Sequence, residues 1–325
     1  MFDPFDERDL ARLRRSIADS SKKYEAHLEN RMKFMRQVAG KHYGAKGEGS
    51  KDYNVFPLMG LALKIFSRLI SSNDPRAHVQ HWDPDFDPYC HELKLSLDDE
   101  FERIDLAAAS NAVTVESFFL HGIMKVGRVV EEMSGNTHDV GSVFADPVLS
   151  EDFIVEMKST RWDRIGYCGD SIRVPLEWAQ ENTDFRKVRK YLQATNDLTS
   201  SPFMGKLRQV RSQVLSNGST NSLPADYEDN VDILSLWFPR ERHILVIDRS
   251  ITHVLQWKKW DGPRNGPYHY LGYTFLPGNL IALPPMADWY DPHMFSNDMA
   301  NMVLEDAVNQ KQILAVSGKN GEKDG

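Results

Sequence analysis

Cysteine is nearly absent from this sequence, which has only Cys90 and Cys168 in 325 residues. The first four residues (MFDP) have no basic start followed by an apolar stretch, so the sequence shows no signal peptide. Without export to an oxidising compartment, a framework of disulfides is not expected. We predict two reduced thiols in a protein that is made and used in the cytoplasm.

Long apolar runs are absent as well. No run approaches the roughly 18 residues that would suggest a membrane span. The most apolar window, residues 55–70, is interrupted by Lys64, Ser67 and Arg68. No membrane partner is therefore expected.

The sequence also lacks an excess of positive charge: 39 Lys and Arg residues face 47 Asp and Glu residues, a formal net charge of -8. Proteins that hold DNA by its phosphates usually carry a basic excess. This balance argues against a free-standing DNA-binding protein. It is compatible with the wall of a channel through which DNA slides, because a strongly attractive wall would hold the DNA still.

Sequence motifs of common enzymes are missing. The sequence contains no GxxxxGK[ST] or GxGxxG loop for phosphates and no GxSxG turn for a nucleophile. It therefore predicts no catalytic residue, no cofactor and no enzyme activity.

One polar segment contains residue types that bind metals: His78, His81, Cys90 and His91, with Asp83, Asp85 and Asp87 between them. Their spacing fits no standard zinc site, and the alternating aspartates lack the glycine and distal glutamate of a calcium loop. We therefore expect a polar surface loop and no metal, with a metal site as the alternative.

Two further features have a structural and a functional interpretation. His121 lies on an apolar helical face, where a core histidine is commoner than a catalyst. The segment 257–260 (WKKW) is able to stack on nucleic acid. We favour a strand that ends in a turn there, because Asp261, Gly262 and Pro263 follow at once.

Hydrophobic periodicity predicts helices in the first half of the chain. A long amphipathic helix is expected over residues 7–38, with its apolar face formed by Leu10, Leu13, Ile17, Tyr24, Leu28, Met35 and Val38. A second helix, over residues 55–71, is apolar nearly all round and is expected to be buried. A loop over residues 81–88 then precedes a third helical region over residues 97–133, capped by Ser96 and ended or kinked by Gly122 and Gly127.

Short strands are predicted in the second half. They cover residues 143–144, 153–155, 172–174, 231–238, 244–247, 251–257 and 268–275, and the fifth and sixth form a hairpin. Pro175 opens a helix over residues 176–193, and Ser296 or Asn297 caps a last helix over residues 296–316. The fold class is therefore α+β, with long amphipathic N-terminal helices and a β-rich unit.

We expect three segments along the chain. Residues 1–50 form an N-terminal amphipathic helix and a basic linker, residues 51–316 a mixed α/β domain, and residues 317–325 a flexible polar tail.

One region is strongly basic and contains a single acid, Asp197; its basic residues are Arg186, Lys187, Arg189, Lys190, Lys206, Arg208 and Arg211. Acidic residues cluster at 83–87, 98–102 and 226–229. We expect the basic residues to lie near DNA or to meet the acidic clusters between subunits.

Four stretches carry a resemblance to a known family. They cover residues 53–79 (a helix that ends before Asp74-Pro75), 107–130 (a helix with a glycine-bearing end), 151–181 (strands leading to a helix opened by proline) and 231–316 (strands, a proline-bounded crossing and a helix with Asn297 and Asn301). In this order they resemble the portal, or head-to-tail connector, proteins of tailed double-stranded DNA bacteriophages. The fold is accordingly expected to be like the wing region of a portal.

The resemblance implies a structural protein of the virion, a ring commonly of about twelve copies at one capsid vertex. DNA would pass through the ring during packaging and ejection. The implied partners are the major capsid protein, a packaging motor ATPase, tail or adaptor proteins, and the double-stranded DNA in the channel.

Family portals are longer and continue into stem, clip and crown regions, so a fragment, one product of a split gene or a reduced relative is expected here. Two alternatives stay open: another head-completion or minor capsid protein, and a metal-dependent nucleic-acid enzyme that uses His78, His81 and His91.

Overall fold

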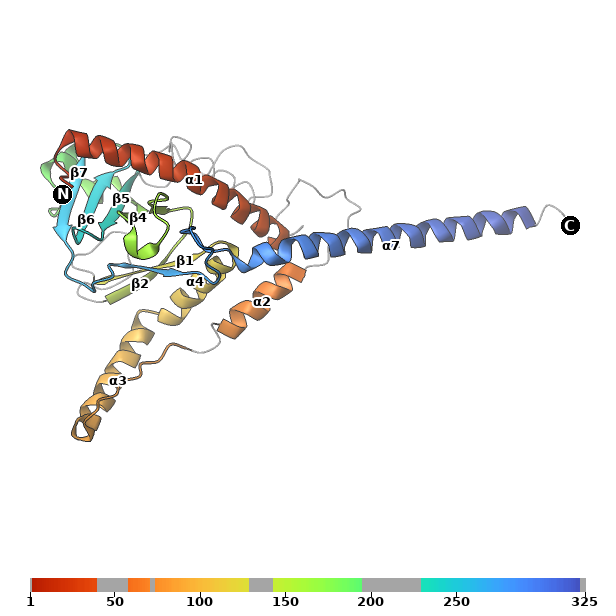
Figure 1. Cartoon of the computed structure of the whole chain (residues 1–325), viewed down its shortest axis with the longest axis horizontal. Coiled ribbons are helices and arrows are strands. Elements are labelled where there is room, and N and C mark those ends of the chain that lie inside the picture. The colour runs from red at the N-terminus through yellow and green to blue at the C-terminus, as the bar shows by residue number, and fades with distance from the viewer. Residues whose placement is uncertain (1, 40–57, 71–73, 129–142, 195–228, 322–325) are drawn as a thin grey trace.

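The computed structural model describes residues 2–39, 58–70, 74–128, 143–194 and 229–321, with side chains up to residue 307. The fold is α+β, as the sequence predicts: a long N-terminal helix lies beside two antiparallel sheets, and further helices extend from them (Figure 1).

Helix α1 (Glu7–Ala39) confirms the predicted amphipathic helix. The Asp6 carboxylate accepts a hydrogen bond from the Arg8 amide at its start, and acidic residues in the first turn complement the helix dipole. The predicted apolar face packs on the sheets, and its buried members are Leu13, Ile17, Tyr24 and Leu28.

The larger sheet has the strand order β3-β4-β5-β6-β7. Its strands are β3 (Phe153–Val155), β4 (Cys168–Pro175), β5 (Asn230–Phe238), β6 (His243–Asp248) and β7 (Val254–Lys259). These confirm the predicted strands and the β6–β7 hairpin. The central β5 is buried along nearly its whole length, which explains its mostly apolar sequence, and Asp232 and Ser235 are its buried polar residues.

Strand β7 begins three residues later than predicted, because residues 248–253 form a closed turn. The Asp248 carboxylate accepts hydrogen bonds from the amides of Thr252 and His253, and Ile251 has a φ of 55°. These bonds outweigh the effect of burial and lower the pKa of Asp248.

The smaller sheet has the order β2-β1-β8 and corrects the predicted third helical region. Residues Gly122–Arg128 form β1, not a helix, and pair on both sides with β2 (Val143–Val148) and β8 (Tyr268–Leu271). At Gly122 the chain passes so close to the preceding helix that a Cβ atom would lie 2.4 Å from the Val113 carbonyl oxygen. A glycine is required at that crossing.

Two helices replace the rest of the predicted region, α3 (Asp87–Arg103) and α4 (Leu106–Phe119). They are separated at Asp105, which is left-handed (φ 48°) and caps α4 by accepting from the Ala108 amide. The predicted cap at Ser96 is wrong, since Ser96 lies inside α3 and its hydroxyl donates to the Glu92 carbonyl. The predicted loop over residues 81–88 contains the short 3-10 helix η2 (Pro84–Phe86), and its last two residues begin α3.

Two other helices differ in length from the prediction. Helix α5 (Leu176–Glu181) stops early, and a 3-10 helix, η4 (Lys187–Tyr191), follows it. Helix α7 (Pro285–Gly321) begins after Pro284 and includes the first residues of the predicted polar tail. The predicted cap Asn297 therefore lies within α7, where its amide pairs with the buried His293 ring.

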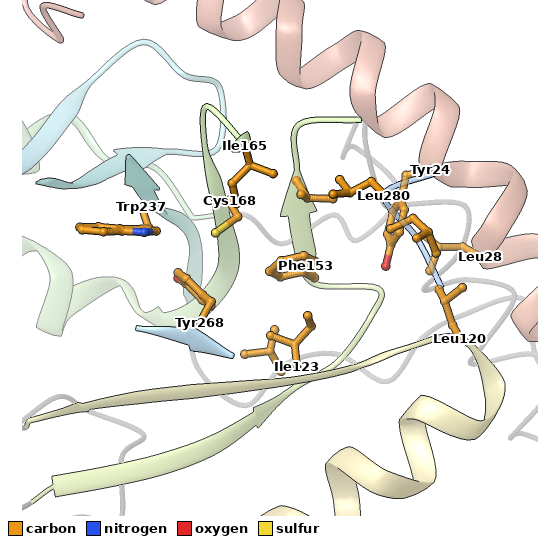
Figure 2. Close-up of a cluster of buried hydrophobic side chains, with 13 residues drawn as sticks. Tyr24, Leu28, Leu120, Ile123, Phe153, Ile165, Cys168, Trp237, Tyr268 and Leu280 are labelled. Carbon is orange, nitrogen blue, oxygen red and sulfur yellow. The ribbon is translucent and has the colours of Figure 1, made fainter. Parts of the chain in front are cut away.

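The main core joins α1 to both sheets (Figure 2). The cluster extends from Tyr24 and Leu28 of α1 past Ile123 of β1 and Phe153 of β3 to Trp237 of β5, and it also includes Leu120, Ile165, Cys168, Tyr268 and Leu280. Within the described ranges, no helix is long and apolar enough to cross a membrane.

Candidate interaction surfaces

A buried ion cluster joins α1, α4 and the segment before β3. The Arg31 guanidinium donates to both Glu116 carboxylate oxygens, at 2.8 and 2.9 Å, and to Glu151 at 2.7 Å. Burial by itself raises the pKa of Glu116, but the charge and hydrogen bonds of Arg31 and Ser150 outweigh it and lower that pKa. The cluster is internal and fixes α1 against the sheets.

His121 lies beside this cluster and is completely buried. Its Nε2 atom is 3.0 Å from the Tyr24 hydroxyl, which itself donates to the Ser150 carbonyl. Nε2 must then carry a proton and donate to Tyr24, while the buried Nδ1 has no hydrogen-bond partner among the described residues that would accept a second proton. Burial lowers the pKa of His121 from 6.5 to about 3. The core interpretation of this histidine fits its geometry.

A second buried group of charges connects the two sheets. The Lys125 ammonium on β1 lies 2.8 Å from the Asp170 carboxylate on β4, and the Tyr268 hydroxyl donates to the same carboxylate. Cys168, next to this group, is a free thiol whose pKa is raised by burial. Cys90 is also a free thiol. The contacts among Lys125, Asp170 and Tyr268 are structural, because they lie inside the protein and not on a ligand-accessible surface.

The structure does not gather the residue types that bind metals. His81 packs on the rings of Trp82 and Phe86, and the Asp83 carboxylate caps η2. Across the described ranges, no three His, Cys, Asp or Glu side chains lie close enough to hold a metal ion.

The segment 257–260 ends a strand and enters a turn. Trp257 stacks on His243, and the Trp260 indole donates to the Pro263 carbonyl at 2.9 Å. The turn interpretation explains these residues.

The predicted basic region is divided by the structure. Arg186 lies over the Phe5 ring, 4.3 Å from its centroid, and Arg189 donates to the Phe185 carbonyl. Lys187 and Lys190 are exposed on η4. Lys206, Arg208 and Arg211 lie outside the described residues. The prediction that the region is an interface stays a prediction, and its exposed described members are Arg186, Lys187 and Lys190.

Helix α3 forms an arm that points away from the sheets (Figure 1). It packs on η2 and α4. Large apolar side chains are exposed on α3 and on the segment just before it, with Trp82 exposed to 88%. The others are Phe86 of η2 and Tyr89, Leu93 and Leu95 of α3. The acidic residues Asp83, Asp85 and Asp87 lie in and beside η2, at the N-terminal end of α3.

Helix α2 (Leu58–Ile70) contradicts the prediction that it is buried on all sides. One face packs on α4 and α7 through Met59 and Phe66. The other face carries an apolar stripe at helical spacing in which Leu69 is 77% exposed. We name this stripe, formed by Leu58, Leu61, Ile65 and Leu69, the α2 stripe.

Helix α7 also has two apolar faces. Met286 and His293 are buried against the body, together with the polar Asn297. The opposite face carries four exposed apolar residues, with Met302 and Val303 exposed to 63% and 65%. We name this set, formed by Phe295, Met299, Met302 and Val303, the α7 stripe. Beyond it the helix extends away from the body (Figure 1).

The sequence contained a signal for both stripes, namely apolar residues spaced by three, four or seven positions. The same helices have apolar residues on their other faces too, so spacing alone did not separate the packed face from the exposed one. Comparison of the chain with models of known protein families and with curated protein sequences gives no match.

Proposed function

We propose that this chain is a portal subunit of a tailed double-stranded DNA bacteriophage, a structural protein that forms a ring at one vertex of the capsid. The sequence resemblance suggests this class. One structural observation supports it most: large apolar side chains are exposed on helices that extend from the body.

Exposed apolar side chains of this size are costly in a protein that works alone. Burying one Leu, Phe or Met side chain contributes about 1.5–3 kcal/mol, and contiguous exposed patches mark interaction sites. The α3 arm, α2 and α7 each present such residues, so association would bury a considerable area. The exposed surfaces of α3, α2 and α7 also differ from one another. A head-to-tail ring needs two different complementary faces.

The resemblance supplies the rest of the proposal. The ring, commonly of about twelve copies, passes DNA inward during packaging by a separate motor ATPase and outward toward the tail. It contacts the major capsid protein and tail or adaptor proteins in the virion. A net charge of -8 suits this role, because DNA must slide through the channel without being held.

The test is the mass and shape of the purified protein, by light scattering and negative-stain imaging. We expect closed rings. A variant with Met302→Asp on the α7 stripe should shift the mass toward smaller species, whereas the matched Ala26→Asp variant, on the exposed face of α1, should not. A wild-type protein that stays monomeric at every concentration would refute the proposal.

A further inference from the structure

The charged residues that accompany the α7 stripe have one sign. Between Pro285 and Ala307 helix α7 contains no lysine or arginine, and its charged residues are Asp288, Asp291, Asp298, Glu305 and Asp306. Asp288 lies seven positions before Phe295, and Asp306 lies seven after Met299. The two aspartates are therefore in line with the stripe, one at each end. This face of α7 is apolar in the middle and acidic around it.

The α2 stripe is accompanied by the opposite charge. Helix α2 contains no acid; Lys64 and Arg68, one turn apart, border the stripe and are exposed. Within the described part of the chain, no ion pair joins Lys64 or Arg68 to Asp288 or Asp306. These four side chains are thus available for a partner.

The geometry points to one partner for both stripes: we propose that the α2 stripe of one copy packs on the α7 stripe of the next copy in the ring. Pairing α7 with α7 would bring acidic faces together, and pairing α2 with α2 would bring basic faces together. Only the unlike pairing places an apolar stripe accompanied by acidic residues on one accompanied by basic residues. It is also head-to-tail, so it continues from copy to copy until the ring closes.

The α7 stripe is the shorter of the two and fits within the length of the α2 stripe. At 1.5 Å per residue, the α2 stripe is about 17 Å long and the α7 stripe about 12 Å. Inside one copy α2 and α7 already pack together, but through their other faces, at Met59, Phe66 and Met286. The intermolecular contact therefore leaves the fold of each copy unchanged. The charges at its border select the partner more than they add affinity.

This inference rests on the proposed ring, and it is tested by cross-linking between two single variants. Two variants are prepared in a Cys90→Ser background, one with Ile65→Cys and the other with Met299→Cys. They are mixed under conditions in which the rings exchange subunits, and the cysteines are then oxidised to form disulfides. Mixing excludes a disulfide within one chain. We expect a covalent dimer only in the mixture, and neither variant alone should give one. Glu29→Cys, exposed on α1, replaces Ile65→Cys as the control and should give none with Met299→Cys.

Charge reversal is the second measurement. Lys64→Glu with Arg68→Glu should lower the ring fraction in light scattering, as should Asp288→Lys with Asp306→Lys. All four changes in one chain should restore it, because the borders of the two stripes then again carry opposite charges. A loss of folding would not give this restoration.

The outcomes separate the inference from the proposed function. Rings with a dimer from Met299→Cys alone would show pairing of α7 with α7 and overturn the inference. Rings with no cross-link and no restoration would overturn the inference while the ring itself stands. Monomers throughout would overturn both.

Discussion

Acid should weaken the fold through His121, whose ring is buried between α1 and the two sheets. Burial lowers its pKa from 6.5 to about 3 in the folded protein. Above pH 6.5 the ring is neutral in both states and has no effect on pH dependence. Between pH 6.5 and about 3 the unfolded chain binds a proton that the folded protein does not bind, so the free energy of unfolding falls as the pH falls.

The size of the effect follows from the shift. One proton bound only by the unfolded chain gives a slope of about 1.4 kcal/mol per pH unit. Over the full interval the loss approaches about 5 kcal/mol, a large share of the roughly 5–15 kcal/mol that stabilises a typical domain.

The perturbation is His121→Phe, which keeps an aromatic ring and removes the titrating group. Urea unfolding followed by circular dichroism at several pH values, at one fixed protein concentration, gives the slope for each protein. Between pH 6 and 4, the free energy of unfolding of the variant should change less steeply with pH than that of the wild type. The difference in slope should correspond to about one bound proton. The control is Tyr24→Phe, which removes the hydrogen bond at 3.0 Å but leaves His121 buried. It should be less stable at every pH with the wild-type slope. Parallel curves for His121→Phe and wild type would refute the reasoning.

Three further predictions concern other sites. Arg31→Met leaves buried carboxylates without their partner and should lower the free energy of unfolding in urea by about 3–5 kcal/mol. An unchanged urea midpoint would contradict the geometry of the cluster. Gly266→Ala should lower the thermal unfolding midpoint, because Gly266 has a φ of 81° and a Cβ atom there would lie 2.4 Å from the Trp237 indole nitrogen. Calorimetry measures the midpoint, and a higher midpoint would contradict this prediction. Lys187→Glu with Lys190→Glu should reduce ring formation in light scattering with no change in thermal midpoint, if the basic region meets an acidic one between subunits.

Local periodicity located much of the secondary structure. The apolar residues of α1 from Leu13 to Leu28 are spaced by four or seven positions, and the strands β5 and β6 are mostly apolar, so each could be predicted without knowledge of its neighbours. The same information placed the basic residues near η4. It could not show that Arg189 turns inward to the Phe185 carbonyl while Lys187 stays exposed, because that depends on where the chain turns after α5.

By itself, therefore, the sequence determined the fold class, the packed face of α1 and the strands of the larger sheet, since each depends on residues close together in the chain. Tertiary structure decided the rest. Residues 122–128 became a strand because β2 and β8 lie on either side of them, although their own sequence also continues a helical pattern. The α2 and α7 stripes are exposed because each helix has more apolar surface than one fold can cover. Which face is covered depends on segments far away in the chain, and this is why the other face stays exposed.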